Sequence, residues 1–423
     1  MNATPIPLEN GLPGTRWIEI ARWSTIVAAC SVMISPPLAN AAMALMLVGL
    51  LASRQAGPRL RHACLQPLGV ATLVLVAVIA AAMLWADVPW RDRWASFWSW
   101  RKLWMVPVAL ALFGPLLWKR RLVTAYVAVS GAAVLVSFGI VAVTGRLPTS
   151  VYDLAGSLLR NHSAQSMAFA TATLLALWLA GDPGLGRRWR WAAAGFAALF
   201  VLNMAFVTPG RSGFLALAAM LIVLVVFNLH SWRSALAAVV LAALLAGAMA
   251  VSPLARDRIA LAVDEWRNAS TQTYKTSMGM RAVMYENTLA VVREQPWLGT
   301  GTGGFGQAYA EVVKDKYTGT DWRAETTVDP HSQYLFFLAE QGILGLVAFL
   351  AFILAALLDR GDGTRARVIA IAMLLGWCAT SLLSSHFKTF SEGHLLALAL
   401  GATLARPMGD LESNSSPAKP GAR

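Results

Sequence analysis

The sequence predicts an all-α integral membrane protein with about 12 transmembrane helices and one large extramembrane segment that itself contains helices. Two observations lead to this class. Of the 423 residues, 57% are hydrophobic and only 13% are charged, whereas a soluble domain carries about a quarter charged residues. Apolar runs of about 17–25 residues recur along most of the chain, and this is the length at which a helix crosses a bilayer.

The predicted helices, read in order with approximate ends, are bounded by loops that contain charged, Gly or Pro residues. They span 17–35, 38–52, 65–86, 101–118, 122–143, 163–180, 190–207, 212–229, 234–251, 332–357, 366–384 and 389–405. The first run is not followed by an A-x-A cleavage site, which indicates a retained helix rather than a removed signal. The three cysteines have no paired spacing, so we predict neither a disulfide framework nor a zinc site.

The distribution of positive charge gives the topology. The chain has 35 Lys and Arg residues against 22 Asp and Glu, a formal net charge of +13. If the N-terminus is cytoplasmic, the short loops on that side hold more than twice as many Lys and Arg residues as the opposite short loops. The positive-inside rule then places both termini in the cytoplasm and segment 252–330 in the periplasm. Topology accounts for most of the basic charge, and no nucleic-acid partner is required.

This topology divides the chain into four parts. Residues 1–251 form an N-terminal membrane region with nine helices, and residues 252–330 form the periplasmic loop. Residues 331–405 form a C-terminal membrane region with three helices. Residues 406–423 are predicted to be a disordered cytoplasmic tail, because their composition is polar and rich in Ser and Pro.

A tryptophan-rich stretch lies between the third and fourth helices. Trp90, Trp94 and Trp98 recur at helical spacing with Arg and Asp residues between them. This pattern is typical of an amphipathic helix in the outer interface, with an ordinary aromatic belt as the simpler alternative to a lipid-binding element. Arg101 follows on the side where topology does not require positive charge, so it is a candidate substrate-binding residue.

Two outer helix starts carry arginine. Arg160 and His162 cluster where a helix should already be apolar, which indicates either a polar floor of an outward cavity or a capped helix start. Arg211 follows a Pro-Gly turn at the N-terminal end of a helix, where its charge opposes the helix dipole. Together with the free amides of that helix end it predicts an anion site, and snorkelling of the side chain is the alternative.

The periplasmic segment contains one clear amphipathic pattern. The stretch R-A-V-M-Y-E-N-T-L-A-V-V-R-E-Q-P predicts a helix from about residue 280 to 295 that ends before Pro296. Arg281 lies on its first turn, and Tyr285 shares the same face.

The next stretch, W-L-G-T-G-T-G-G-F-G, is rich in glycine. Gly299, Gly301 and Gly304 match G-x-G-x-x-G, but no strand precedes them and no helix clearly follows, so neither a dinucleotide site nor any other cofactor is predicted. The remaining interpretations are a flexible turn, or a backbone that must approach a ligand or helix closely.

The stretch D-P-H-S-Q-Y-L-F-F-L-A-E-Q-G-I-L-G joins the periplasmic segment to the tenth helix. His331 lies at this junction, and an ionisable residue where a polar loop meets a membrane helix is a functional-site candidate. The alternative is an exposed interfacial histidine without a role. Further along the same stretch, Gly342 and Gly345 indicate close helix packing.

The outward polar residues suggest one chemistry. The set consists of Arg160, His162, Arg211, Arg281 and His331, with Arg101 and Lys388 as further members. Arginines bind phosphates through paired hydrogen bonds, and histidine is the usual proton acceptor near neutral pH. The outer side has no D-x-D motif and no His and carboxylate grouping, so no metal is predicted. These residues suit a lipid whose head group carries a diphosphate.

Two blocks resemble the O-antigen ligase/polymerase family. The first is R-A-V-M-Y-E-N-T-L with the following W-L-G-T-G-T-G-G-F, and the second is the stretch around His331. Twelve helices with a long loop before the tenth are also similar to this family. The resemblance implies a glycosyltransferase of the bacterial inner membrane, with a donor of undecaprenyl diphosphate carrying O-antigen and a lipid A-core acceptor. It further implies an inverting transfer at the periplasmic face, without metal or cofactor.

The resemblance also implies roles for single residues. His331 matches the essential histidine, Arg211 the arginine after the outer turn, and Arg281 the loop arginine, whereas Arg160 is added from its position alone. O-antigen polymerases and protein O-oligosaccharyltransferases remain alternatives within the family, the latter weakened because no soluble domain follows the last helix. A transporter of anionic lipids or solutes is a further alternative, and it predicts polar residues at mid-membrane in broken helices.

Overall fold

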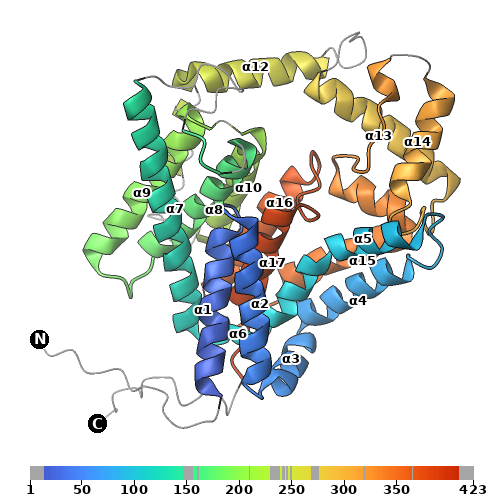
Figure 1. Ribbon diagram of the computed structural model, residues 1–423. Coiled ribbons are helices and arrows are strands. Elements are labelled where there is room, and N and C mark those ends of the chain that lie inside the picture. Colours follow the sequence, from blue (N-terminus) through green and yellow to red (C-terminus); the bar gives the residue numbers. More distant parts are fainter. Residues whose placement is uncertain are drawn as a thin grey trace, which may run out of the picture.

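The structure is a computed structural model that describes residues 14–145, 156–159, 162–208, 210–228, 251–267, 276–317, 321–363 and 365–408, with scattered positions between 239 and 250. In this part of the chain every regular element is a helix, as predicted (Figure 1). The helices are α1 (Thr15–Ser31), α2 (Pro36–Ala52), α3 (Ala56–Cys64), α4 (Pro67–Ala81), α5 (Trp90–Ser99), η1 (Arg101–Trp104), α6 (Met105–Leu112), α7 (Leu116–Thr144), α8 (His162–Ala180), α9 (Arg187–Phe206), α10 (Arg211–Asn228), α12 (Pro253–Arg267), α13 (Ser277–Glu294), α14 (Phe305–Lys316), η2 (Trp322–Ala324), α15 (Gln333–Leu358), α16 (Ala366–Thr380) and α17 (Phe390–Leu404).

Four helices in the described residues are long and apolar enough to cross a membrane, namely α7, α8, α9 and α15. A fifth span results if α2 and α3, which meet at a bend of 111°, are taken together. Helices α4, α16 and α17 are apolar but have 15 residues each, and the apolar stretch Arg211–Phe227 of α10 is also too short to count as a span. The chain is therefore a multi-pass membrane protein by its helices, while twelve spans and a periplasmic position of segment 252–330 remain predictions. Most of the predicted helix 234–251 lies outside the described residues.

The predicted helices 101–118 and 122–143 are wrong in their bounds. The chain forms η1 and the eight-residue α6, and then breaks at Phe113-Gly114-Pro115 before α7 begins. Pro115 has an extended backbone and caps α7, and the residue before a proline is disfavoured in helical conformation. Lys119 and its two arginine neighbours therefore lie in the first turns of α7 and not in a loop.

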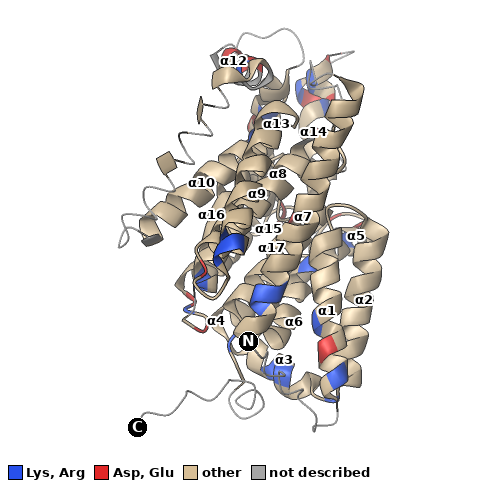
Figure 2. Ribbon diagram, turned by 90° about the vertical axis from the view of Figure 1, so that its left-hand side faces the viewer, with Lys and Arg blue, Asp and Glu red and all other residues tan. Residues whose placement is uncertain are grey.

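The two ends of the molecule are built from different helices. Helix α1 begins and α17 finishes toward one end, and α12, α13 and α14 from segment 252–330 lie at the other (Figure 1). Figure 2 shows Lys and Arg residues at the end where α1 begins and also around α12, α13 and α14 at the opposite end.

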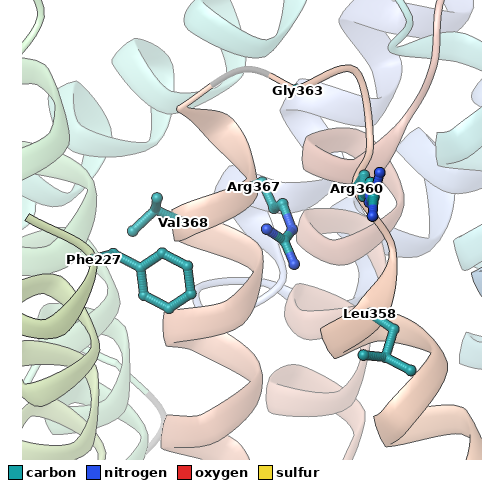
Figure 3. A pocket seen from close by; sticks show the side chains of 6 residues that line it. All are labelled: Phe227, Leu358, Arg360, Gly363, Arg367 and Val368. Atoms are coloured by element: carbon teal, nitrogen blue, oxygen red, sulfur yellow. The ribbon is translucent and has the colours of Figure 1, made fainter.

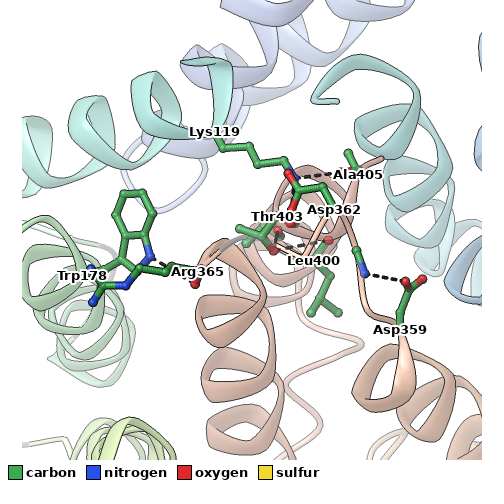
Figure 4. A network of polar contacts seen from close by, with 10 residues as sticks. Lys119, Trp178, Asp359, Asp362, Arg365, Leu400, Thr403 and Ala405 are labelled. Atoms are coloured by element: carbon green, nitrogen blue, oxygen red, sulfur yellow. Dashed lines mark hydrogen bonds and ion pairs between the residues drawn. The ribbon is translucent and has the colours of Figure 1, made fainter. Parts of the chain in front are cut away.

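At the end where α1 begins, a buried ionic network fixes the helix termini (Figure 4). The Nζ atom of Lys119 in α7 lies 2.7 Å from Oδ2 of Asp362 and donates to two carbonyls at the end of α17, at 3.1 and 2.8 Å. Beside it, Arg406 pairs with the buried Asp359 at 2.6 Å. Buried charges require such partners. These contacts fix the start of α7 relative to the ends of α15 and α17.

A cavity of about 570 Å³ opens at the same end, between α10, α15 and α16 (Figure 3). Its lining combines apolar and basic side chains: Phe227, Leu358, Arg360, Gly363, Arg367 and Val368. The 26 residues of α15 separate it from His331, a path of at most about 39 Å at 1.5 Å per residue. This cavity is therefore distinct from the histidine junction.

Candidate functional site

Helix α15 is broken, and the glycine-rich segment (residues 296–304) fills the break. Gly342 has φ 65° and ψ −161°, which only glycine adopts readily. The two amides that follow Gly342 donate to the carbonyls of Pro296 and Trp297, at 2.9 and 3.4 Å. In return, the carbonyls of Ala339 and Glu340 accept from two amides of the segment, at 2.9 and 2.8 Å. The backbone amides and carbonyls that lack partners within α15 because of the break are thus bonded to the segment.

The glycines of the segment allow this close approach. A Cβ atom on Gly299 would lie 2.6 Å from the carbonyl oxygen of Ala339, and one on Gly301 would lie 2.4 Å from Cα of Ala86. The prediction of a backbone that approaches a helix closely is confirmed, and the flexible turn is wrong. Helix α14 begins at Phe305, directly after the segment, which also corrects the expectation that no helix clearly follows.

A buried carboxylate joins this break to α5. Glu340 accepts hydrogen bonds through Oε1 from the amide of Gly303 at 3.1 Å and from the hydroxyl of Ser96 at 3.5 Å. Its Oε2 accepts from the side chain of Gln341 at 3.2 Å. The predicted tryptophan helix is present as α5, with Trp90, Trp94 and Trp98 on an exposed stripe. Helix α5, the glycine-rich segment and α15 therefore form one connected unit.

His331 lies in a tight turn just before α15. Its backbone has φ 55°, a left-handed conformation that is uncommon for residues other than glycine. Its amide donates to Oδ1 of Asp329 at 2.8 Å, and the same oxygen accepts from the hydroxyl of Ser385 at 2.6 Å. The side chain is exposed, and its ring has no hydrogen-bond partner among the described residues. The turn thus presents a free imidazole.

Helix α13 docks on this turn and on the 382–389 loop, which joins α16 to α17. The hydroxyl of Tyr285 lies 3.2 Å from the carbonyl of His331 and 2.6 Å from that of Leu382. One turn earlier, Nε of Arg281 donates to the carbonyl of Leu383 at 3.1 Å. The predicted shared face of Arg281 and Tyr285 is confirmed, and it is the face that contacts the histidine turn.

Arg281 also lies close enough to Arg211 for their charges to interact. Burial and, to a smaller extent, the charge of Arg211 lower the pKa of Arg281, although a guanidinium group stays protonated. Its Nη1 donates to the hydroxyl of Ser277 at 2.8 Å, and no described group bonds its Nη2. Two neighbouring positive charges, one of them partly desolvated, form a place where an anion would be stabilised.

Arg211 is paired in this structure. Its Nη1 lies 3.2 Å from Oε2 of Glu265 on α12, while its Nε is buried without a partner. Glu265 is buried, and the same oxygen accepts from the amide of Met278 at 3.3 Å. A protein carboxylate therefore occupies part of the anion position predicted at the start of α10. No sequence signal indicated Glu265, because its helix is brought to Arg211 only by the tertiary fold.

The other predicted site residues lie away from Arg211, Arg281 and His331, or outside the described residues. Arg160 and the side chain of His162 fall outside them. The guanidinium carbon of Arg101 lies 5.8 Å from the ring centroid of Trp98 and 5.6 Å from that of Phe390, directly after the 382–389 loop, whereas Arg281 contacts Leu383 near the start of this loop. Within the described part of the chain, no group of three or more His, Cys, Asp or Glu side chains could hold a metal ion.

The 382–389 loop contributes residues that sequence reasoning did not select. Ser385 bonds to Asp329, and the next residue, His386, is buried with the charges of Asp329 and Arg281 acting on it. The polar run S-S-H-F-K-T between two apolar helices was the available signal. It was insufficient because nothing in it indicates that this loop contacts the turn of His331.

Comparison with known proteins identifies this region. Residues 196–350 match the family model described as O-Antigen ligase. Over these residues the chain is similar to O-antigen ligases. The matched residues include Arg211, Arg281, His331 and the break at Gly342, so the resemblance to this family is confirmed over the segment that builds the site.

A curated relative adds little about function. An uncharacterized protein of Haemophilus influenzae is 34% identical over 82 residues, and the match covers 19% of this chain and 19% of that protein. The chain thus matches about a fifth of the length of that relative. The family match and the apolar helices together indicate a multi-pass membrane protein that is similar to O-antigen ligases over residues 196–350.

Proposed function

We propose that this protein transfers O-antigen polysaccharide from undecaprenyl diphosphate to the lipid A-core acceptor at the periplasmic face of the bacterial inner membrane. One observation carries the proposal. Arg211, Arg281 and His331 all lie in the segment that matches the O-antigen ligase family, and α13 connects them through the Tyr285 contact with His331 and the charge interaction between the arginines. The reaction needs neither metal nor cofactor, because the sugar–diphosphate bond is already activated.

His331 is the proposed general base. Its imidazole accepts the proton of the acceptor hydroxyl while that oxygen attacks the anomeric carbon of the donor sugar. The bond from this carbon to the diphosphate breaks, the electron pair leaves with the diphosphate, and the configuration inverts. General-base assistance of this kind contributes roughly 10²–10⁴-fold to the rate. The contacts of Asp329 and Tyr285 fix the backbone of the turn that carries this imidazole.

Arg281 and Arg211 are proposed to stabilise the departing diphosphate. Negative charge grows on that group as the bond breaks, and fixed cations at its position lower the barrier. The carboxylate of Glu265 pairs with Arg211 in this structure, so the donor diphosphate competes with Glu265 for one guanidinium group. With two formal charges and several oxygens, a diphosphate satisfies both arginines where one carboxylate does not.

The break in α15 was the feature expected of a transporter, and its surroundings argue for an enzyme. Transporters use the unsatisfied backbone groups of broken helices to bind ions or substrates. Here the amides after Gly342 and the carbonyls of Ala339 and Glu340 are bonded to the glycine-rich segment. The break therefore serves to join a segment outside α15 to this helix, and it leaves those backbone groups unavailable to a solute.

The test is transfer in vitro from purified lipid-linked polysaccharide to lipid A-core, with a chelator and without nucleotide. Wild-type protein is expected to transfer, His331→Ala to lose at least about 100-fold in rate, and Arg281→Ala a comparable factor. Arg360→Ala, in the cavity at the other end, is the matched control and should transfer normally. Normal transfer by His331→Ala would contradict the role of His331 as general base. Retained transfer by both Arg281→Ala and Arg211→Ala would contradict the stabilisation of the diphosphate by these arginines.

A deletion strain separates the ligase from a polymerase with the same site. Accumulation of full-length polymer on the carrier lipid identifies the deleted protein as a ligase. Single repeats attached to the lipid A-core identify it as a polymerase instead.

A further inference from the structure

Two arginines line the cavity that opens where α15 ends and α16 begins. It has a volume of about 570 Å³, and Arg360 and Arg367 line it together with Phe227 and Leu358 (Figure 3). Arg360 belongs to the loop after α15, and Arg367 to the first turn of α16. We call these two residues the cavity arginines. The length of α15 separates them from His331, so they are not part of the proposed transfer site.

The acidic residues of the loop after α15 do not neutralise the cavity arginines. Asp359 pairs with Arg406 at 2.6 Å, and Asp362 pairs with Lys119 at 2.7 Å. In the described part of the chain, no carboxylate forms an ion pair with either cavity arginine. The partial charges of the two helix ends, negative after α15 and positive before α16, are about equal and cancel. The cavity therefore keeps close to two positive charges.

The guanidinium group of Arg367 is held in position by the backbone. Its Nε donates to the carbonyl of Asp359 at 2.8 Å, and its Nη2 donates to that of Leu357 at 3.0 Å. No described group accepts from its Nη1 or from the guanidinium group of Arg360, which is exposed. Both groups line an open cavity and are therefore accessible to a ligand. Guanidinium groups with free N–H donors bind phosphate oxygens through charge-assisted hydrogen bonds.

The surface that leads to the cavity is apolar. Leu350, Leu354 and Leu358 recur at four-residue spacing on one face of α15 and are exposed, and Phe227 at the end of α10 is exposed as well. Helix α15 is long and apolar enough to cross a membrane, so exposed leucines on it suit contact with lipid chains. A soluble phosphate would use only the arginines, whereas a phospholipid with an anionic head group would use both surfaces.

We propose that this cavity binds the head group of an anionic phospholipid. Arg360 and Arg367 contact its phosphate, and its acyl chains lie along the exposed leucines of α15. Basic pockets between membrane helices recognise anionic head groups in this way. The proposed lipid belongs to the bilayer leaflet at the end where α1 begins, and the inference does not depend on glycosyl transfer.

The test measures lipid binding by the purified full-length protein in a neutral detergent. Phosphatidylglycerol is titrated in, and the protein with one lipid bound is quantified by native mass spectrometry, which gives an apparent Kd. Arg360→Gln removes one charge without removing a side-chain contact to any described residue. Arg16→Gln is the matched control, because Arg16 is an exposed arginine at the start of α1 that does not line the cavity.

A second variant, Arg367→Gln, removes the other cavity charge. Because this side chain also bonds the last carbonyls of α15, thermal unfolding is measured for every variant, and binding is expressed per amount of folded protein. Two further ligands are compared on the wild-type protein. Phosphatidylcholine has the same acyl chains without a net charge, and glycerol phosphate has the anionic group without the chains.

Arg360→Gln and Arg367→Gln are each expected to raise the Kd for phosphatidylglycerol about tenfold, the effect of one lost charge-assisted hydrogen bond. Arg16→Gln should change it by no more than about twofold, because salt screens a charge outside the cavity. Wild-type protein should bind phosphatidylcholine about tenfold more weakly, and glycerol phosphate at an equal concentration should not displace the lipid. An equal loss in Arg360→Gln and Arg16→Gln would overturn the site, since it would reflect only the overall positive charge. Displacement by glycerol phosphate would overturn the lipid as occupant in favour of a soluble phosphate.

Discussion

The break at Gly342 gives a quantitative prediction for Gly342→Ala. A Cβ atom at this position would lie 2.2 Å from the carbonyl oxygen of Trp297 and 2.6 Å from the amide nitrogen of Leu298. Both atoms are backbone, so neither moves away as the end of a flexible side chain would. The alanine must either hold a strained left-handed conformation or push the glycine-rich segment out of the break.

The expected cost combines two contributions. A non-glycine residue in this backbone conformation costs about 1–3 kcal/mol. Displacing the segment weakens the two hydrogen bonds that the amides after Gly342 donate to it, at about 0.5–1.5 kcal/mol each. Gly342→Ala is therefore expected to lower the free energy of unfolding by about 2–6 kcal/mol, and to lower transfer because His331 directly precedes the first half of α15.

The assay is equilibrium unfolding in mixed micelles, with transfer measured on the same preparations. Gly195→Ala in α9 is the matched control, because nothing lies within 4 Å of the added Cβ, and alanine favours a helix by about 1 kcal/mol over glycine. If Gly342→Ala unfolds within about 1 kcal/mol of the control and transfers normally, the interpretation of the break as a tightly fitted junction is wrong.

Three further predictions concern the site. Tyr285→Phe removes the hydroxyl that contacts the carbonyl of His331, and it should slow transfer about 3–30-fold while costing only about 1 kcal/mol in unfolding; unchanged kcat would contradict the positioning role. Glu265→Gln removes the ionic partner of Arg211. Because the donor diphosphate then no longer competes with this carboxylate, the KM of the donor should fall several-fold, roughly the effect of losing a partly exposed ion pair. A higher KM would contradict competition with the diphosphate. Burial lowers the pKa of His386 below its ordinary 6.5, so in more acidic solution the unfolded chain binds a proton that the folded protein does not. The free energy of unfolding should therefore fall by up to about 1.4 kcal/mol per pH unit below pH 6.5. Unfolding measured at pH 7.5 and at pH 5.5 should show a smaller difference for His386→Gln than for the wild-type protein.

Periodicity and run length predicted the elements whose formation is decided locally. The amphipathic helices α5 and α13 were predicted from residues on one face, and the contact of Arg281 and Tyr285 with one surface confirms that reasoning for α13. The long apolar runs were predicted as helices for the same reason. These features depend on neighbours three or four residues apart.

Contacts between distant residues were not predictable in this way. Glu265 lies 54 positions from Arg211, and Asp362 lies 243 positions from Lys119. The break in α15 was also missed, because Gly342 followed by apolar residues is equally typical of a closely packed helix. Only the tertiary structure shows that another part of the chain supplies the hydrogen bonds that make the break stable.

The way the glycine-rich segment enters α15 has a consequence for domain exchange between relatives. The glycine-rich segment is not independent of α15, since its amides and carbonyls complete the main-chain hydrogen bonds of this helix. A graft cut at the predicted border near residue 331 would separate mutually dependent halves. An exchange that begins before α13 and ends beyond Gly345 would transplant the interlocked piece whole, together with the histidine turn.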